Sequence, residues 1–116
     1  MTLQARIQSL VDTHHDEWIA IRRHLHANPE LSFQEHETMA FVAKTLADWG
    51  IEHQTEITET GIVAHVRGVD PGSRLVALRA DMDALPIQEA NDVTYASTRA
   101  GVMHALSLIH ISEPTR

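Results

Sequence analysis

The architecture of this chain depends on one short apolar run, Leu75-Val76-Ala77-Leu78, which continues into Arg79-Ala80-Asp81-Met82-Asp83-Ala84-Leu85-Pro86. A segment rich in turn-forming residues, 68–73, precedes the run, and charged residues follow it. An apolar run with these boundaries is typical of a strand that is covered on both faces of its sheet. The sequence therefore predicts a central strand at residues 75–78.

Charged side chains follow directly at the end of this strand. Because side chains alternate along a strand, Arg79, Asp81 and Asp83 are expected on one face. Open α/β sheets build their sites at the carboxyl ends of central strands, where carboxylates can hold a metal ion or orient a ligating histidine. The alternative is a structural ion pair between Arg79 and the aspartates, and the spacing alone favours that alternative.

Two helices are predicted before the run. Apolar residues spaced three and four apart indicate an amphipathic helix over residues 2–27. Asn28-Pro29 ends it, because proline disfavours helical backbone in the residue before it. Ser32 and Glu35 match a capping box at the start of a second helix, over about residues 33–49.

The apolar faces of these helices are predicted to form the core. Trp18, Ile21 and Leu25 lie on one face of the first helix and are expected to be buried together. Trp49 is expected to pack near the start of the sheet, and Gly50 stands at the C-terminal cap position of the second helix.

Two further strands are predicted between the second helix and the run. The period changes to two after Gly50, which indicates a half-exposed strand over residues 51–57, and a second strand is expected over residues 62–67. Helices beside a sheet with a buried strand define an α/β layered domain. Two helices and three strands leave that sheet incomplete, so we expect a truncated architecture.

Composition and charge exclude several classes of protein. The chain has 116 residues, 43% of them hydrophobic, which suits one small globular domain. Its net charge of -7 opposes binding to nucleic acid or to an anionic membrane. No apolar stretch approaches the roughly 18 residues of a membrane span, and charged residues interrupt the N-terminal region where a signal peptide would lie. We therefore expect a cytoplasmic protein.

Histidines are numerous, and cysteine is absent. The chain has nine histidines and no cysteine, which excludes disulfides and Cys-based zinc sites. His14 and His15 are adjacent on a helix and His24 and His26 are two apart, so the members of each pair point in different directions and cannot chelate one ion. His14 lies on the apolar stripe and is expected to be a satisfied core residue or a half-buried one. The isolated histidines are expected to be exposed: His36, His53 and His65.

Three stretches, in order, resemble one family. They are residues 22–33, residues 78–87, and residues 95–105 with Gly101-Val102-Met103-His104-Ala105. Together they resemble the two-metal amidohydrolases and peptidases that include hippurate hydrolase, aminoacylases and the auxin-conjugate hydrolases. The resemblance runs from about residue 6 to residue 105.

The resemblance implies a fold and an activity. It implies that residues 1–105 are the N-terminal portion of a three-layer α/β/α catalytic domain. The implied reaction is hydrolysis of the amide bond of N-acyl amino acids of the hippurate or N-acetyl type. In the family, two divalent metal ions such as zinc or manganese activate a bridging water, and a glutamate serves as general base and acid. Asp81 would support that metal centre from near the site, with Asp83 and Arg79 fixing the local geometry.

The same resemblance bears on partners. The implied partner is a small N-acyl amino acid, and family members often dimerise through a lid domain that would lie outside this chain, so a homodimer is possible for the whole protein.

The resemblance ends at Ala105. In the family, a cysteine ligand, a glycine, a histidine ligand and an aspartate follow, whereas this chain continues Leu106-Ser107-Leu108-Ile109-His110. We therefore expect residues 106–116 to be a non-matching tail, the chain to hold no metal ligands of its own, and the 116 residues alone to be inactive. The tail resembles a string attributed to translated adaptor or vector sequence; the alternative is the genuine C-terminus of an isoform.

A function of a different class remains open at this stage. The same scaffold could serve as a non-catalytic domain for binding or assembly. Such a domain is expected to close its sheet and cover its apolar edge, whereas an incomplete catalytic domain leaves both exposed.

Overall fold

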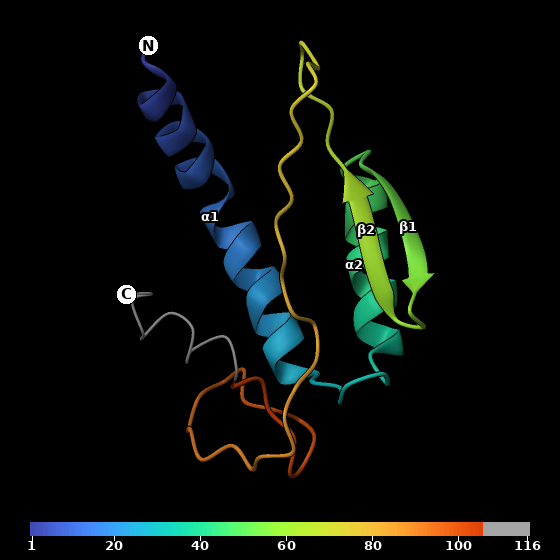
Figure 1. Ribbon diagram of the computed structural model, residues 1–116. Coiled ribbons are helices and arrows are strands. Elements are labelled where there is room, and N and C mark those ends of the chain that lie inside the picture. The colour runs from blue at the N-terminus through green and yellow to red at the C-terminus, as the bar shows by residue number, and fades with distance from the viewer. Residues whose placement is uncertain (106–116) are drawn as a thin grey trace, which may run out of the picture.

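The computed structural model describes residues 1–105, which form two helices and one β-hairpin joined to long irregular segments (Figure 1). The helices are α1 (Leu3–Ala27) and α2 (His36–Asp48), and the strands are β1 (Glu52–Ile57) and β2 (Gly61–His65). α2 packs against both strands, while α1 lies on the other side of the extended chain that follows β2. Residues 106–116, the predicted tail, lie outside the described residues.

α1 confirms the predicted first helix to within one residue. Its N-cap is Thr2, whose side-chain oxygen accepts a hydrogen bond from the Ala5 amide at 3.2 Å, satisfying one of the free amides of the first turn. Its C-cap is Asn28, whose side chain donates to the His24 carbonyl at 2.8 Å. Pro29 follows and is fully buried.

The start of α2 differs from the predicted capping box. Ser32 is exposed, and Glu35, the N-cap, makes no side-chain capping bond; its carboxylate accepts instead from the Thr60 hydroxyl at 2.6 Å. A tight turn, in which the Gln34 amide donates to the Leu31 carbonyl at 2.9 Å and Phe33 has a φ of 62°, occupies the residues where the helix was expected. Because that turn takes up the chain, α2 begins at His36.

Glu30 provides the cap that the sequence rule assigned to Ser32. Its carboxylate accepts from the Thr38 amide at 2.5 Å, the Thr38 hydroxyl at 2.6 Å and the Glu37 amide at 3.2 Å. These amides belong to the first turn of α2, where backbone donors have no partner within the helix. Glu30, at 4% exposure, is therefore a buried anion at a helix N-terminus, where the helix dipole favours negative charge.

Gly50 ends α2 as predicted. Its φ of 69° is in the left-handed region that glycine adopts at little cost. The Gly50 amide donates to the Ala47 carbonyl and the Ile51 amide donates to the Leu46 carbonyl, both at 2.9 Å. This pair of bonds is the Schellman arrangement, and it directs the chain back into β1.

The hairpin confirms the two strands predicted after Gly50. β1 and β2 are antiparallel, with Glu52 opposite His65, and the register shifts between Gln54 and Ile57. Gly61 is required at the turn, because a Cβ there would lie 2.5 Å from the Ile57 carbonyl oxygen.

The predicted central strand at residues 75–78 is wrong for this structure. Leu75, Val76 and Leu78 are 91%, 84% and 97% exposed. The segment is extended (Figure 1), yet within residues 1–105 no hydrogen bond between two backbone groups joins residues 74–83 to another segment. A strand needs a neighbour, and here the only two strands of the described chain pair with each other. The described residues therefore contain two helices and a sheet of two antiparallel strands.

The predicted core on α1 is also wrong. α1 buries no residue, and Trp18 is 42% exposed, because no layer of the described chain covers its apolar face. His14, expected in the core or half-buried, is exposed; its Nδ1 atom lies 3.0 Å from Glu17 Oε2, and its ring stacks on Trp18. Trp49 is 48% exposed, and its indole nitrogen donates to Glu17 at 3.2 Å. Among residues 1–105, neither helix has the length and apolar content of a membrane span.

Candidate functional site

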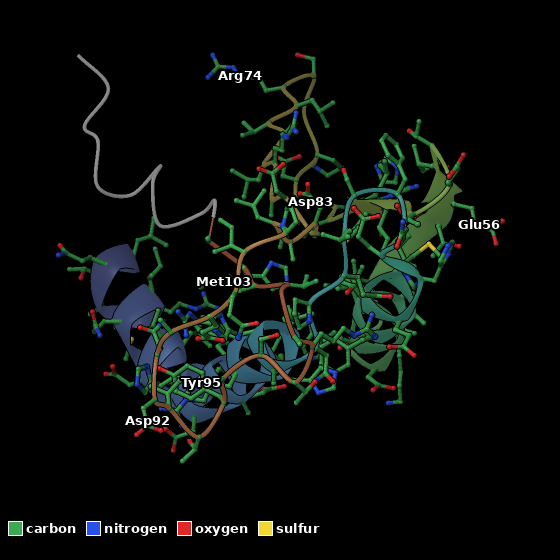
Figure 2. All side chains as sticks on the ribbon, turned by 90° about the horizontal axis from the view of Figure 1, so that it is seen from below. Glu56, Arg74, Asp83, Asp92, Tyr95 and Met103 are labelled. Carbon is green, nitrogen blue, oxygen red and sulfur yellow. The ribbon has the colours of Figure 1, made fainter. Side chains whose placement is uncertain are left out.

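The three stretches that carry the family resemblance meet at one place in the structure. The Ala84 amide donates to the Glu30 carbonyl at 2.7 Å, and Leu31 and Ala84 form a parallel bridge. Leu85 and Met103 form an antiparallel bridge through two hydrogen bonds of 2.9 and 3.0 Å. Figure 2 shows Asp83 and Met103 near this meeting point, with Arg74 far away at the tip of its loop. We call this region the junction; its buried members are Pro29, Glu30, Ala84 and Met103.

The segment before Met103 is fastened to both helices. Thr98 donates to the Ala27 carbonyl through its amide at 2.9 Å and through its hydroxyl at 2.7 Å, at the end of α1. Arg99 forms an ion pair of 2.6 Å with Glu37 in the first turn of α2. These contacts fix how residues 97–103 approach the junction.

A second cluster lies beside the junction around His26. The His26 Nε2 atom is 2.9 Å from Glu89 Oε1, and the two side chains are 11% and 3% exposed. The Ser97 amide donates to the other Glu89 oxygen at 2.6 Å. The Ser97 amide and, second, His26 lower the pKa of Glu89 from 4.5 to about 2, so Glu89 is ionised at neutral pH. Tyr95 meets the His26 ring edge-on and also carries the Arg23 guanidinium over its face.

His104 adjoins this cluster with an unusual environment. Its Nε2 atom is buried and has no hydrogen-bond partner among the described residues. Its ring centroid is 6.5 Å from that of His26. Burial lowers the pKa of His104 from 6.5, and His26 lowers it further, while the hydrogen bond to the Asp83 backbone and the Asp83 charge act in the opposite direction.

Asp81 lies at the rim of the junction and faces solvent. Arg79 donates to Asp81 Oδ1 through Nε at 3.3 Å and through Nη2 at 3.0 Å, with 89% of the Arg79 side chain and 38% of the Asp81 side chain exposed. This is the structural ion pair that the spacing favoured. Asp83 is half-buried and takes no part in that pair. The structure therefore brings Arg79 and Asp81 together and places Asp83 next to His104.

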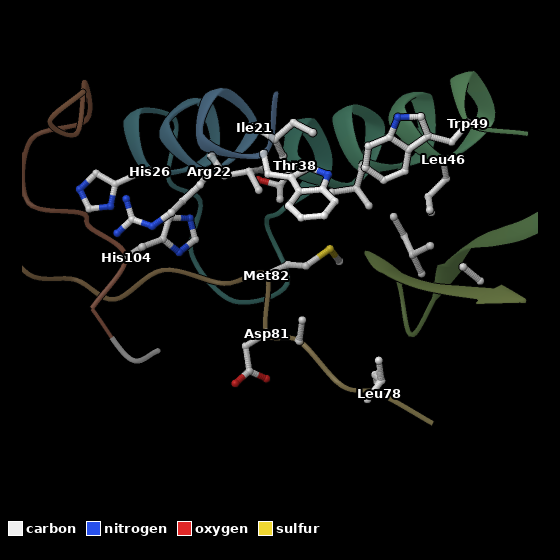
Figure 3. A pocket seen from close by; sticks show the side chains of 16 residues that line it. Ile21, Arg22, His26, Thr38, Leu46, Trp49, Leu78, Asp81, Met82 and His104 are labelled. Carbon is white, nitrogen blue, oxygen red and sulfur yellow. The ribbon is translucent and has the colours of Figure 1, made fainter. Parts of the chain in front are cut away.

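An open cavity of about 650 Å³ lies between α1, α2, β2 and the segment around Met82 (Figure 3). Figure 3 shows Arg22, His26 and His104 gathered at one end and Trp49 at the other, with the Asp81 carboxylate directed away from the helices. A second hollow of about 430 Å³, on the hairpin side, includes Asp81, Asp83 and Glu35 in its lining. Asp81 borders both spaces.

The described residues do not make a metal centre by themselves. Among residues 1–105, no three side chains of His, Cys, Asp or Glu converge as a metal site requires. As their spacing indicated, His24 and His26 point to different partners: His24 stacks on Phe41, with ring centroids 4.1 Å apart, and His26 pairs with Glu89. No step of a metal-dependent reaction can therefore be assigned to this arrangement alone.

Comparison with known proteins places this arrangement among metal-dependent hydrolases. The chain is 54% identical over 99 residues to an N-acyl-L-amino acid amidohydrolase of Geobacillus stearothermophilus, covering 85% of this chain and 26% of that protein. It is 49% identical over 87 residues to an N-acetyl-L-cysteine deacetylase of Bacillus subtilis, covering 75% of this chain and 21% of that protein. No protein-family model matches the chain.

A solved structure has the same backbone arrangement. The Bacillus subtilis YXEP protein, a dinuclear metal-binding peptidase of the M20 family, superposes with a TM-score of 0.74 at 41% identity, covering 80% of this chain and 26% of that one. The sequence match and the structural match fall in one class of proteins, the metal-dependent amidohydrolases and peptidases. The chain belongs to the M20 family and spans about a quarter of the length of the relatives it matches.

Sequence reasoning missed three residues that organise the site. Glu30, His26 and Glu89 carry its buried charge and its long-range pairing. Glu30 caps a helix that begins six residues later, outside the spacing of a capping box. His26 and Glu89 are 63 residues apart, and no periodic pattern joins them. Only the resemblance of residues 22–33 to the family pointed to the stretch in which His26 and Glu30 lie.

Proposed function

We propose that this chain provides the N-terminal part of the catalytic domain of an amidohydrolase that cleaves the amide bond of N-acyl amino acids, in a domain of three layers, α/β/α. The single observation that carries the proposal is the 54% identity to an N-acyl-L-amino acid amidohydrolase across 85% of this chain. Divalent metal ions belong to this reaction in the proposal, with their ligands supplied outside residues 1–105.

The junction supports this function. Three segments far apart in the sequence are joined there by backbone hydrogen bonds, and two of them carry side chains that can take part in chemistry, Asp81 and His104. Preorganised surroundings of this kind hold reacting groups in fixed positions, which is how much of an enzyme's rate enhancement arises. In the proposal, Asp81 supports the reaction centre from near the site, and Asp83 and Arg79 set its position.

A chimera tests the proposal. In it, the matching 99-residue segment of the Geobacillus enzyme is replaced by the corresponding residues of this chain. We expect hydrolysis of N-acetyl amino acids or hippurate, loss of activity after treatment with a chelator, and recovery with zinc, manganese or cobalt. A folded chimera that takes up metal and hydrolyses neither substrate class would overturn the proposal.

Two variants of the chimera separate the role of Asp81 from general effects of charge. Asp81→Ala is expected to lower kcat by about 10- to 100-fold, the range measured when groups that support a metal centre are removed. Asp70→Ala is the matched control, because Asp70 is exposed in the turn-rich loop before the apolar run. Equal activity of the two variants would remove Asp81 from the proposed site.

A further inference from the structure

Backbone pairing brings His104 next to the segment that carries Asp81. Two hydrogen bonds of 2.9 and 3.0 Å pair Leu85 with Met103 in an antiparallel bridge. The next residue along the chain, His104, therefore lies opposite Ala84. Ala84 and Met103 are 3% and 9% exposed, so the backbone on both sides of the bridge is enclosed. The pairing places the His104 side chain at the cavity that Asp81 also lines (Figure 3).

The two nitrogen atoms of the His104 ring have different surroundings. Nε2 is buried and has no hydrogen-bond partner among residues 1–105, so the hydrogen bond between the ring and the Asp83 backbone uses Nδ1. By itself that bond acts to raise the pKa of His104, so its acceptor is the Asp83 carbonyl oxygen. A neutral imidazole has one N–H and one lone pair. Nδ1 therefore carries the proton, and Nε2 carries the lone pair.

Asp83 is the point at which the extended segment leaves the junction. Within residues 1–105, no hydrogen bond between two backbone groups joins residues 74–83 to another segment, and the first such bond is at Ala84. The ion pair between Arg79 and Asp81 lies within the segment, so it does not tie the segment to the rest of the molecule. A side chain that holds the Asp83 carbonyl therefore limits the directions in which Asp81, two residues away, can point.

We propose that His104 is a positioning residue for Asp81. Its Nδ1–H donates to the Asp83 carbonyl and holds the chain where it leaves the junction, so that the Asp81 carboxylate is presented in one direction. The inference rests on the proposed function, in which Asp81 supports the reaction centre, and it adds which side chain holds Asp81 there. The role requires an N–H group at the position of Nδ1.

Nuclear magnetic resonance of the 116-residue chain tests the contact without any activity. With ¹⁵N-labelled histidine at pH 7.5, His104 Nδ1 should have the chemical shift of a protonated ring nitrogen and Nε2 that of an unprotonated one. His104→Asn places an amide N–H where Nδ1 lies, and His104→Gln places one where Nε2 lies. In ¹⁵N relaxation measurements, the Asp81 and Met82 amides should stay ordered in His104→Asn and become more mobile in His104→Gln.

A double-mutant cycle in the chimera shows whether His104 acts through Asp81. His104→Gln should lower kcat by about tenfold with KM unchanged, whereas His104→Asn should keep most of the activity. In the Asp81→Ala background, His104→Gln should lower kcat by no more than about twofold, because there is no carboxylate left to position. His15→Gln, on an exposed part of α1, is the control and should lower kcat in neither background.

The outcomes separate this inference from the proposed function. A proton on Nε2 in place of Nδ1, equal mobility of the Asp81 amide in the two His104 variants, or a full tenfold loss in the Asp81→Ala background would overturn the inference. An active chimera would leave the proposed function standing in each of these cases. A folded, metal-loaded and inactive chimera would end the proposed function, while the tautomer and the order of the Asp81 amide would still decide whether His104 holds Asp81.

Discussion

His26 and Glu89 lie 63 residues apart in the sequence and 2.9 Å apart in the structure, with both side chains almost completely covered. The pair fastens the end of α1 to the loop that leads toward Met103. Because Glu89 also accepts the Ser97 amide, one carboxylate holds two segments at once. This ionised side chain therefore acts together with the two hydrogen bonds from Thr98 to the Ala27 carbonyl, which also hold the end of α1.

Acid is expected to weaken this attachment within a defined range. The folded-state pKa of Glu89 is lowered from 4.5 to about 2, so its ionised form stabilises the fold above pH 4.5, and that contribution is lost as the pH falls from 4.5 toward 2. Glu89→Gln should lower the thermal midpoint at pH 6, and its difference from the unchanged protein should narrow below pH 4.5. Glu56→Gln, on the exposed hairpin, is the control and should show no such convergence.

Protonation of His104 is expected to lower the stability of the fold at a higher pH than protonation of Glu89 does. Its pKa is lowered from 6.5, chiefly by burial, so the neutral ring is favoured in the folded state, and stability is lost as the pH falls below 6.5. Urea midpoints at pH 7.5 and 5.5 measure this loss. His104→Gln should show a smaller drop between the two pH values. If the urea midpoint of His104→Gln fell between the two pH values as much as that of the unchanged protein, His104 would not be the group that titrates.

Glu30 and Ser32 give opposite expectations for the start of α2. Glu30→Ala should reduce the free energy of unfolding by about 1 to 2 kcal/mol, because it removes the cap and leaves the Thr38 amide and hydroxyl without their acceptor. Ser32→Ala should have no measurable effect, because Ser32 is exposed and makes no capping bond. Chemical denaturation measures both changes in the free energy of unfolding. A larger loss for Ser32→Ala than for Glu30→Ala would support the predicted capping box.

Leu25 tests whether the face of α1 is uncovered. In the 116-residue chain, Leu25→Ala should cost about 1 kcal/mol or less, because Leu25 is only half-buried and lines an open cavity. In the chimera the same change should cost about 2 to 5 kcal/mol, the usual range for a buried leucine. Equal costs in the two proteins would show that the remainder of the chain does not cover this face.

The 116-residue chain is expected to bind no catalytic metal tightly and to hydrolyse neither hippurate nor N-acetyl amino acids. Among residues 1–105, Asp81 is engaged with Arg79, and no three ligating side chains converge. Without a metal ion, nothing lowers the pKa of an attacking water from 15.7. Calorimetric titration with zinc or manganese tests the first part. Stoichiometric submicromolar binding that disappears in Asp81→Ala would contradict it.

Local features of the fold were predictable, and features that depend on distant neighbours were not. The period of the apolar residues located both helices, and Gly50 marked the end of α2 through its own backbone preference. The start of α2 was misplaced, because a turn at residues 31–34 and a carboxylate from Glu30 decide it. Periodicity reports which residues prefer to share a face, while burial requires something to cover that face.

The run at residues 75–78 illustrates the same limit. Its composition is that of a covered strand, yet it is exposed, because strand pairing and burial are properties of at least two segments. Alternation along the chain grouped Arg79, Asp81 and Asp83, and the structure pairs two of them, Arg79 and Asp81, while their role at a reaction centre stays a prediction. The family resemblance added His26, Glu30 and His104 as members of matching stretches, without indicating what each one contacts.

The open cavity also matters while the protein is being synthesised. In relatives of this family, the segment equivalent to this chain leaves the ribosome with about three quarters of the protein still to be made. At about 5–20 residues per second, its apolar wall and free strand edge stay uncovered for tens of seconds. In this chain, the net charge of -7 opposes strand pairing between neighbouring copies while these surfaces are uncovered, because like-charged copies repel each other.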